Sequence, residues 1–199
     1  MKNISLTHSF EYRATKDFRQ QLAESGSLQA LTKNIIDQSK TMNPDRYDPL
    51  KYRGDAFEWF AEFFYKFFDG DNLFLNVTEY EPIKASSDYG VDGVGKYTKD
   101  LSKTVGLQHK FRSDAHKRLS STEDGLSSFG LNAITKYSIE PDEKYIVVFT
   151  NASGITRETQ EGIYNGCVRC INREIISRYV DTNQAFWDCF GKTVSKVTP

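Results

Sequence analysis

The sequence lacks long apolar runs and has few cysteines. None of its stretches approaches the ~20 consecutive apolar residues that a membrane-spanning helix needs, so we expect no membrane partner. The segment 1–8 has neither the apolar stretch nor the small-residue cleavage site of a secretory signal. The three cysteines are an odd number, which fits free thiols in a reducing compartment. These absences predict a cytoplasmic protein.

Several catalytic signatures are absent as well. The sequence contains no Gly-x-Ser-x-Gly nucleophile elbow and no phosphate-binding P-loop. Gly90, Gly93 and Gly95 have the wrong spacing for a dinucleotide fingerprint, and they precede an expected strand rather than a helix. Cys167 and Cys170 form only one half of a zinc site, because no second Cys or His pair stands at a usable spacing. We therefore expect these two cysteines to be small buried residues, with a redox pair as the alternative.

Charge is nearly balanced over the whole chain but unevenly distributed along it. The 199 residues include 26 Lys and Arg against 27 Asp and Glu, which argues against indiscriminate coating of nucleic acid by the whole surface. Segment 96–118 has seven bases and two acids, whereas segment 39–82 has five bases and nine acids. A basic stretch beside an acidic one suits a polyanion and a divalent cation that meet at one place. Ordinary solvated loops would give the same pattern.

The spacing of apolar residues predicts the secondary structure. Helical spacing places helices at 14–40, 54–68, 122–138, 156–164 and 172–190. Alternating or continuous apolar runs place strands at 73–80, 89–97, 104–111, 144–150 and 167–171, the first three as a meander. We therefore predict an α/β fold in which helices flank a small mixed sheet. We divide the chain into an N-terminal helical arm, 1–50, and a main domain with C-terminal helices, 51–199.

Two of the expected strands carry residues that suit chemistry. Gln108 and Lys110 are two residues apart on one strand, so their side chains share a face. Asp92 lies among glycines on the preceding strand, where a neighbouring backbone or ligand can approach closely. If these strands pair, a carboxylate, an amide oxygen and a lysine converge, which predicts a hard-cation site with a charged donor for water or phosphate. Asp88 is the rival for the carboxylate position.

This order of elements and residues resembles the restriction-endonuclease-like PD-(D/E)XK nucleases. The closest similarity is to the Mrr-like branch, in which Gln replaces the usual acid. The matching segments are Gly-Asp-Ala-Phe-Glu at 54–58, Tyr-Gly-Val-Asp-Gly at 89–93 and Val-Gly-Leu-Gln-His-Lys at 105–110. Val91 stands where the family name has proline. The resemblance covers about residues 54–180 and implies an αβββαβ core.

The resemblance also implies an activity and roles for four residues. Asp92 would be the principal metal-binding carboxylate, and Gln108 would be the second ligand. Lys110 would be the catalytic lysine, and Glu58 would be the helix glutamate that completes the site. The implied function is a metal-dependent DNA endonuclease that hydrolyses phosphodiester bonds in restriction, phage defence or DNA processing. Because the ligands are hard oxygens, we expect Mg²⁺ or Mn²⁺.

Several basic residues are expected to hold the DNA backbone without reading its sequence. They are Lys96, Lys103, Arg112, His116, Lys117 and Arg118. We expect segment 111–122 to be a basic loop that orders on DNA. His109, by contrast, falls on the apolar face of its strand and is expected to pack in the core. A homodimer would supply the two sites that cutting both strands requires.

Other interpretations stay open. Taken singly, Glu58 fits a solvated helix residue, Asp92 a turn aspartate, and Gln108 with Lys110 a solvated strand face. The chain could be a non-catalytic nucleic-acid-binding module, which would bind without a metal. It could also be an interaction domain of a larger system with a helicase or methyltransferase partner. Four aromatic residues that we expect to be exposed suggest this last possibility: Trp59, Phe63, Trp187 and Phe190. The form of the nucleic acid, DNA or RNA, is not predicted.

Overall fold

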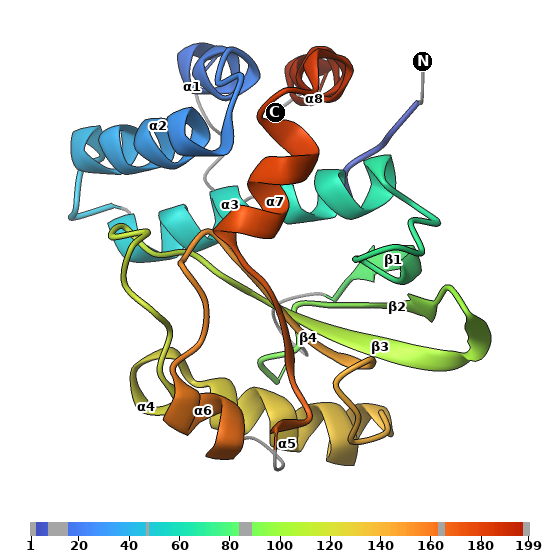
Figure 1. Ribbon diagram of the computed structural model, residues 1–199. Helices are drawn as coiled ribbons and strands as arrows, with labels where there is room; N and C mark the ends of the chain where they lie inside the picture. The colour runs from blue at the N-terminus through green and yellow to red at the C-terminus, as the bar shows by residue number, and fades with distance from the viewer. Residues whose placement is uncertain (1–2, 8–15, 47, 84–88, 163–165, 197–199) are drawn as a thin grey trace.

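The fold is a mixed five-stranded sheet with helices on both faces (Figure 1). The computed structural model describes residues 3–7, 16–46, 48–83, 89–162 and 166–196. The strands are β1 (Val77–Pro82), β2 (Gly93–Tyr97), β3 (Asp100–Lys110), β4 (Ile146–Thr150) and β5 (Arg169–Ile171). They lie side by side in the order of the sequence. This confirms the predicted α/β class and small mixed sheet.

The sheet changes direction once. Strands β1, β2 and β3 form an antiparallel meander, as predicted, while β4 and β5 run parallel to β3. All five residues of β4 are buried, because helices cover both faces of the sheet at this strand. This burial explains the nearly continuous apolar run of its sequence. The parallel pairing also brings the ends of β3 and β4 together, with Lys110 opposite Thr150.

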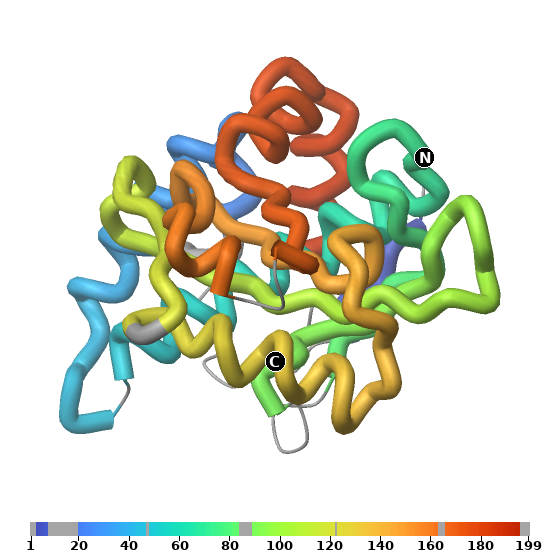
Figure 2. Tube along the Cα trace, turned by 60° about the horizontal axis from the view of Figure 1, so that its bottom comes forward, coloured from blue at the N-terminus to red at the C-terminus, as the bar shows by residue number. Residues whose placement is uncertain are grey.

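Helices of different regions of the chain form the two layers. They are α1 (Lys16–Ala23), α2 (Leu28–Thr41), α3 (Pro49–Phe67), α4 (Ser121–Asp124), α5 (Leu126–Tyr137), α6 (Arg157–Gly162), α7 (Arg173–Val180) and α8 (Gln184–Lys196). Helices α4, α5 and α6 lie on one side of the sheet, and the other five lie on the opposite side, with α3 against the strands (Figures 1 and 2). None of the described helices is both long and apolar enough to cross a bilayer.

Helix α3 begins earlier than the predicted residue 54. Asp48 caps it, because its carboxylate accepts a hydrogen bond from the Leu50 N–H at 2.8 Å, and Pro49 occupies the first turn, where a missing N–H costs nothing. The helix is buried on most of its circumference, since the sheet covers one side and α2 and α8 contribute to the cover on the other. The earlier start adds residues 49–53 to the helix that carries Glu58.

The expectation that four aromatic residues are exposed is wrong. Trp59 and Phe63 on α3 and Trp187 and Phe190 on α8 are all at most 3% exposed. The two helices pack their aromatic rings against each other: the ring centroids of Phe63 and Phe190 are 5.0 Å apart, and those of Phe60 and Trp187 are 6.3 Å apart. These four rings form part of the core and are not available to a partner.

Turns shift the starts of the first two strands relative to the prediction. One carboxylate oxygen of Asp71 accepts hydrogen bonds from three successive backbone N–H groups, which folds the segment before β1 into a turn. Tyr89 and Gly90 have positive φ angles of 47° and 79°, so the chain turns there and β2 begins only at Gly93. The predicted helix 122–138 is likewise two helices, because Gly125 adopts a left-handed conformation between α4 and α5.

Candidate active site

Three of the four predicted catalytic residues line one pocket. Glu58, Asp92 and Lys110 surround a cavity of about 260 Å³ at the end of β3. Its other lining residues are Leu50, Arg53, Gly54, His109, Phe111 and Ser113. The structure therefore brings together an acid from α3, an acid that precedes β2 and a lysine at the end of β3. We call this cavity the Asp92 pocket.

Asp92 is held between strand β3 and Ile83, the residue that follows β1. Its backbone N–H donates to the Leu107 carbonyl at 2.9 Å, and its own carbonyl accepts from the Ile83 N–H at 2.9 Å. Its carboxylate oxygen Oδ2 accepts a hydrogen bond from the backbone N–H of His109 at 2.5 Å. The backbone thus fixes both the position of the residue and the direction of its carboxylate. This precision fits a ligand that must hold an ion in one place.

Glu58 and Glu62 lie one turn apart on α3 but have different surroundings. Glu62 is fully buried, and its Oε1 accepts hydrogen bonds from the Thr7 N–H at 2.7 Å and the Thr7 hydroxyl at 2.9 Å. The ammonium of Lys66 lies 2.5 Å from the same oxygen. Glu58 is only half-buried and lines the Asp92 pocket. Glu62 therefore has a structural role, whereas Glu58 is the helix acid that faces the site.

Lys110 is the last residue of β3. Its carbonyl accepts a hydrogen bond from the Thr150 hydroxyl at 2.6 Å, which fixes the end of the strand against β4. Within the described part of the chain, its ammonium makes no ion pair closer than 4 Å, whereas Lys66, Lys103 and Lys117 each pair with a glutamate. Lys110 lines the same pocket as Glu58 and Asp92, and a lysine ammonium without an ion-pair partner is suited to hold a water molecule or a phosphate oxygen.

Arg53 is a pocket residue that the sequence analysis did not identify. Its guanidinium donates from Nε to the Ser39 hydroxyl and from Nη1 to the Ser113 hydroxyl, both at 2.7 Å. These two bonds hold the guanidinium at the pocket wall. The start of α3 was the signal in the sequence that could have identified it, because Asp48 and Pro49 form a helix cap. With the helix starting there, Leu50, Gly54 and Glu58 lie at intervals of four on one face, and Arg53 lies next to that face.

Gln108 is not among the residues that line the Asp92 pocket. It is 3% exposed, and its Nε2 would lie 3.5 Å from a Cβ atom added to Gly90. Gly106, two residues earlier on the same face, lies against Ala133 of α5 and Ile139, which follows it, so Gln108 faces the α5 side of the sheet. Its Oε1 accepts no hydrogen bond from any residue that the structure describes. The predicted ligand is therefore buried beside the pocket and does not enter it.

The pocket partly fits a hard divalent cation. Glu58 and Asp92 supply two carboxylates, and Mg²⁺ is commonly held by one or two carboxylates while water and substrate phosphate complete its coordination. Across the described ranges, no group of three or more His, Cys, Asp and Glu side chains gathers closely enough to hold a metal. A cation here would need oxygen ligands from water and substrate. The rival ligand Asp88 lies outside the described residues.

The bases that were predicted to contact DNA have partners within the protein. Arg112 pairs with Asp124 at 2.6 Å and Glu123 at 3.3 Å, and Lys117 also pairs with Glu123 at 3.3 Å. The acids of α4 thus neutralise much of the charge of segment 111–122. The Lys117–Glu123 pair is exposed and contributes little free energy, so a polyanion can compete for Lys117, whereas the Arg112–Asp124 pair is largely buried.

The other predicted contacts are distributed around the sheet. Lys103 pairs with Glu140, and the ammonium of Lys96 lies 3.5 Å from the Thr104 hydroxyl. Arg118 donates to the Ile155 carbonyl at 3.3 Å. None of these bases lines the Asp92 pocket, whose basic side chains are those of Arg53 and Lys110. His116 lines a neighbouring pocket, which is described below.

His109 is packed in the core, whereas Cys167 and Cys170, which we expected to be buried, are each only partly buried. His109 is 6% exposed, and its ring centroid lies 5.8 Å from Phe149 and 5.9 Å from Tyr80, which confirms its predicted place in the core. Burial raises the pKa of the Cys170 thiol to about 12. This thiol is therefore protonated at neutral pH and a poor nucleophile or metal ligand, which argues against a redox role for the pair with Cys167.

Comparisons with known proteins do not assign the chain to a family. A scan against models of protein families and searches of curated proteins and of solved structures found no match to the chain. No relative therefore assigns an activity, and the geometry of the Asp92 pocket is the observation from which we infer function.

Proposed function

We propose that the protein is a metal-dependent nuclease that hydrolyses phosphodiester bonds in the Asp92 pocket. One observation supports this function above all others: Glu58, Asp92 and Lys110 come from three separate segments of the chain and line the same cavity. Each of them has an unremarkable explanation alone, but two carboxylates and a lysine that line one cavity are the groups that metal-dependent hydrolysis of a phosphodiester uses.

Each side chain can be given a task in the reaction. The carboxylates of Glu58 and Asp92 would bind Mg²⁺ or Mn²⁺, which when bound lowers the pKa of water and offsets charge on a phosphoryl oxygen. The ammonium of Lys110 would donate to the attacking water or to a non-bridging phosphate oxygen, where negative charge develops. Arg53 is already oriented by Ser39 and Ser113 and would hold the phosphate group in the pocket.

The arrangement of elements is in keeping with this proposal. A helix, an antiparallel meander, a second helix and a parallel strand follow one another in the order that the resemblance to PD-(D/E)XK nucleases leads us to expect. We leave Gln108 out of the minimal centre, since it would have to turn away from Gly90 to reach a cation in the pocket. DNA is the substrate that the resemblance favours, in restriction, phage defence or DNA processing.

The proposal is tested by cleavage of labelled duplex DNA, single-stranded DNA and RNA with Mg²⁺, with Mn²⁺ and with EDTA. We expect cleavage of at least one substrate that needs the metal and is lost in Asp92→Asn. Asp37→Asn is the matched control, because it neutralises an exposed acid of α2 that pairs only with surface lysines. Equal cleavage by wild type and Asp92→Asn would refute the proposed site, and binding without cleavage under all conditions would favour the non-catalytic module.

A further inference from the structure

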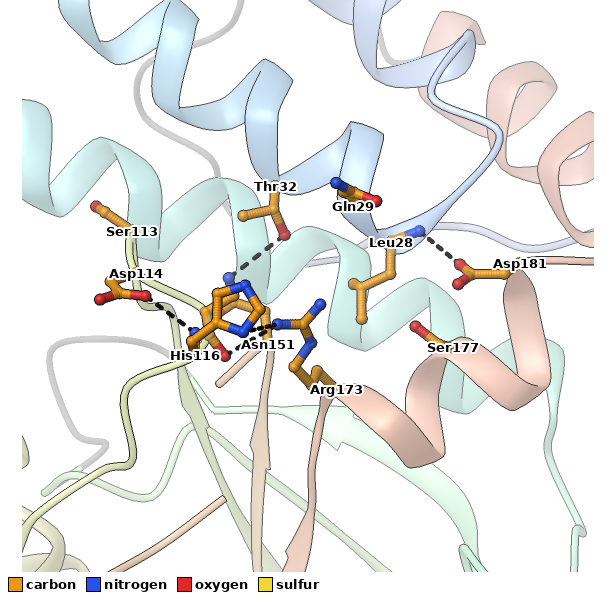
Figure 3. Close-up of a pocket in the computed structure, with 11 residues that line it drawn as sticks. Leu28, Gln29, Thr32, Ser113, Asp114, His116, Asn151, Arg173, Ser177 and Asp181 are labelled. Atoms are coloured by element: carbon orange, nitrogen blue, oxygen red, sulfur yellow. Dashed lines mark hydrogen bonds between the residues drawn. The ribbon is translucent and has the colours of Figure 1, made fainter. Parts of the chain in front are cut away.

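A second pocket adjoins the Asp92 pocket. It encloses about 250 Å³ between α2, α7 and the segment that follows β3 (Figure 3). Ser113 lines both pockets, and its hydroxyl accepts the hydrogen bond from Arg53. A nucleic acid strand with a phosphate in the first pocket would therefore pass the mouth of the second. We call this cavity the Arg173 pocket.

Arg173 projects into the middle of this pocket from the first position of α7 (Figure 3). Its Nη1 lies 3.4 Å from the Ala115 carbonyl and 3.3 Å from Nδ1 of His116. A guanidinium can only donate, so Nδ1 is the acceptor and His116 carries its proton on Nε2. Among the described residues, Arg173 has no acidic partner within 4 Å, and its Nε and Nη2 groups donate to none of them. Two adjacent donors are thus available to a ligand.

Two carboxylates lie on opposite sides of the contact between Arg173 and His116 (Figure 3). Oδ1 of Asp114 accepts from the backbone N–H of His116 at 3.0 Å, and Oδ1 of Asp181 accepts from the N–H of Leu28 at 2.8 Å. Each residue therefore has a second carboxylate oxygen that can accept a hydrogen bond from a ligand. The pocket offers a pair of donors and, to either side of it, acceptors.

The base of the Arg173 pocket is preformed. Asn151 is 1% exposed, and its side chain binds both backbone groups of Arg112, with Oδ1 accepting from the N–H at 2.7 Å and Nδ2 donating to the carbonyl at 2.8 Å. Its Nδ2 also lies 3.4 Å from the Thr32 hydroxyl of α2. The segment after β3 is thereby fastened against α2, and binding would require little rearrangement.

The charges of the pocket disfavour a phosphate group. One guanidinium attracts an anion, but the two carboxylates repel it. An unpaired guanine base matches the pattern, since its O6 and N7 accept from an arginine fork while its N1–H and N2 amine donate to a carboxylate. Resting on the proposed nuclease function, we propose that the Arg173 pocket binds an unpaired guanine next to the phosphate that is cut.

The test measures binding without a metal, so it does not depend on cleavage. Fluorescence anisotropy in EDTA compares an oligothymidine with the same strand carrying one guanine, one 7-deazaguanine or one hypoxanthine. We expect the guanine to improve the dissociation constant about tenfold, and the loss of N7 or of the N2 amine to remove most of that gain. Arg173→Lys keeps the charge but loses the fork, so it should abolish the preference for guanine. Lys110→Ala should keep the preference for guanine.

Three outcomes would overturn the proposal. Equal affinity for all four strands would show that no base is read. A uniform loss of affinity for all strands in Arg173→Lys would indicate a phosphate contact instead. Absence of binding to any strand would exclude a subsite for unpaired bases, whereas metal-dependent cleavage of duplex DNA by the same preparation would leave the nuclease function intact.

Discussion

At the scale of single residues, the surroundings of two glutamates on one helix separate a catalytic role from a structural one. Both Glu58 and Glu62 are acids on α3, but Glu62 is buried and bonded to Thr7 and Lys66, whereas Glu58 is half-buried and lines the Asp92 pocket. From their spacing in the sequence alone, either glutamate could be the acid that faces the site. The fold distinguishes them, because Glu58 lines the Asp92 pocket and Glu62 does not.

We predict opposite effects for substitutions of these two glutamates. Glu62→Gln removes a buried charge opposite Lys66 and should lower the free energy of unfolding by about 1–3 kcal/mol. Glu58→Gln should leave stability within about 0.5 kcal/mol and reduce metal-dependent cleavage strongly. Urea unfolding and a cleavage assay on the folded fraction measure both quantities. The assignment fails if Glu62→Gln is the variant that stays stable and loses activity.

Lys110 is predicted to act in the reaction rather than in binding. Lys110→Met keeps the length of the side chain and removes the charge, so cleavage should fall by about 100-fold or more. Affinity for DNA in EDTA should change by less than threefold, because Arg53 and other bases still contact the backbone. Retention of full activity in this variant would remove the lysine from the mechanism.

The lining of the Asp92 pocket illustrates what a sequence can predict at this scale, while the catalytic roles of these residues stay predictions. The prediction that Glu58, Asp92 and Lys110 lie at one site agrees with the pocket that they line, since their types and order carry chemical meaning. Arg53 was missed because its position in the pocket depends on where α3 begins and on hydrogen bonds to two serines distant in sequence. The place of Gln108 was not predictable either, because it depends on the packing of α5 against Gly90 and Gly106.

At the scale of elements, close contact between β1 and β2 depends on a glycine. A Cβ atom on Gly95 would lie 2.6 Å from Cγ1 of Val77 and 2.9 Å from the Thr78 carbonyl, both on β1. The carbonyl belongs to the paired backbone and cannot move aside without disturbing the sheet. We expect Gly95→Ala to lower the free energy of unfolding by about 1–3 kcal/mol.

Gly54 provides the matched control for that substitution. It lies within α3, and a Cβ atom added there meets nothing within 4 Å. Gly54→Ala should therefore raise the free energy of unfolding by up to about 1 kcal/mol, because alanine favours helix and restricts the unfolded chain. Urea unfolding of both variants tests the pair. Equal effects would contradict this account of the packing between β1 and β2.

Most elements were predicted, but their ends often were not. The meander, the buried strand β4 and the helices that flank them follow from apolar periodicity. The start of α3 and the division between α4 and α5 depend on single residues, the Asp48 cap and the left-handed Gly125. Periodicity does not register such local hydrogen bonds and backbone conformations, so boundaries shift by several residues.

At the scale of the whole molecule, the titration of side chains whose pKa values burial raises links the free energy of unfolding to pH. Burial raises the pKa of Cys170 to about 12, and it raises the pKa of Tyr65 and Tyr80 above the usual tyrosine value, with the charge of Asp92 adding to the effect on Tyr80. Since the unfolded chain loses these protons first, the stability they contribute is complete below about pH 8.5 and falls as pH rises towards 12.

We therefore predict that the protein loses stability in alkali. Between about pH 8 and about pH 10, Cys170 alone should lower the free energy of unfolding by about 1 kcal/mol, and the tyrosines should add to the loss at higher pH. Urea unfolding at the two pH values measures the change, and Cys170→Ser should reduce it. A free energy of unfolding that rises over this interval would contradict the assignment of these groups as buried.

The aromatic core is a feature that only the complete fold reveals. The rings of α3 and α8 meet although more than a hundred residues separate them, and their burial removes the observation that had suggested a protein-interaction surface. Periodicity identified both helices as amphipathic but could not show that α3 is covered on nearly all sides. Long-range packing of this kind is not encoded in local spacing.

The central claim is that Glu58 and Asp92 hold a catalytic cation beside Lys110. A crystal soaked in Mn²⁺ tests it most directly, because the anomalous signal identifies the ion and its position. We predict a peak inside the Asp92 pocket, within coordination distance of the carboxylates of Glu58 and Asp92, and no peak there in Asp92→Asn. An ordered pocket without a peak at saturating Mn²⁺, or a peak that persists in Asp92→Asn, would contradict the account.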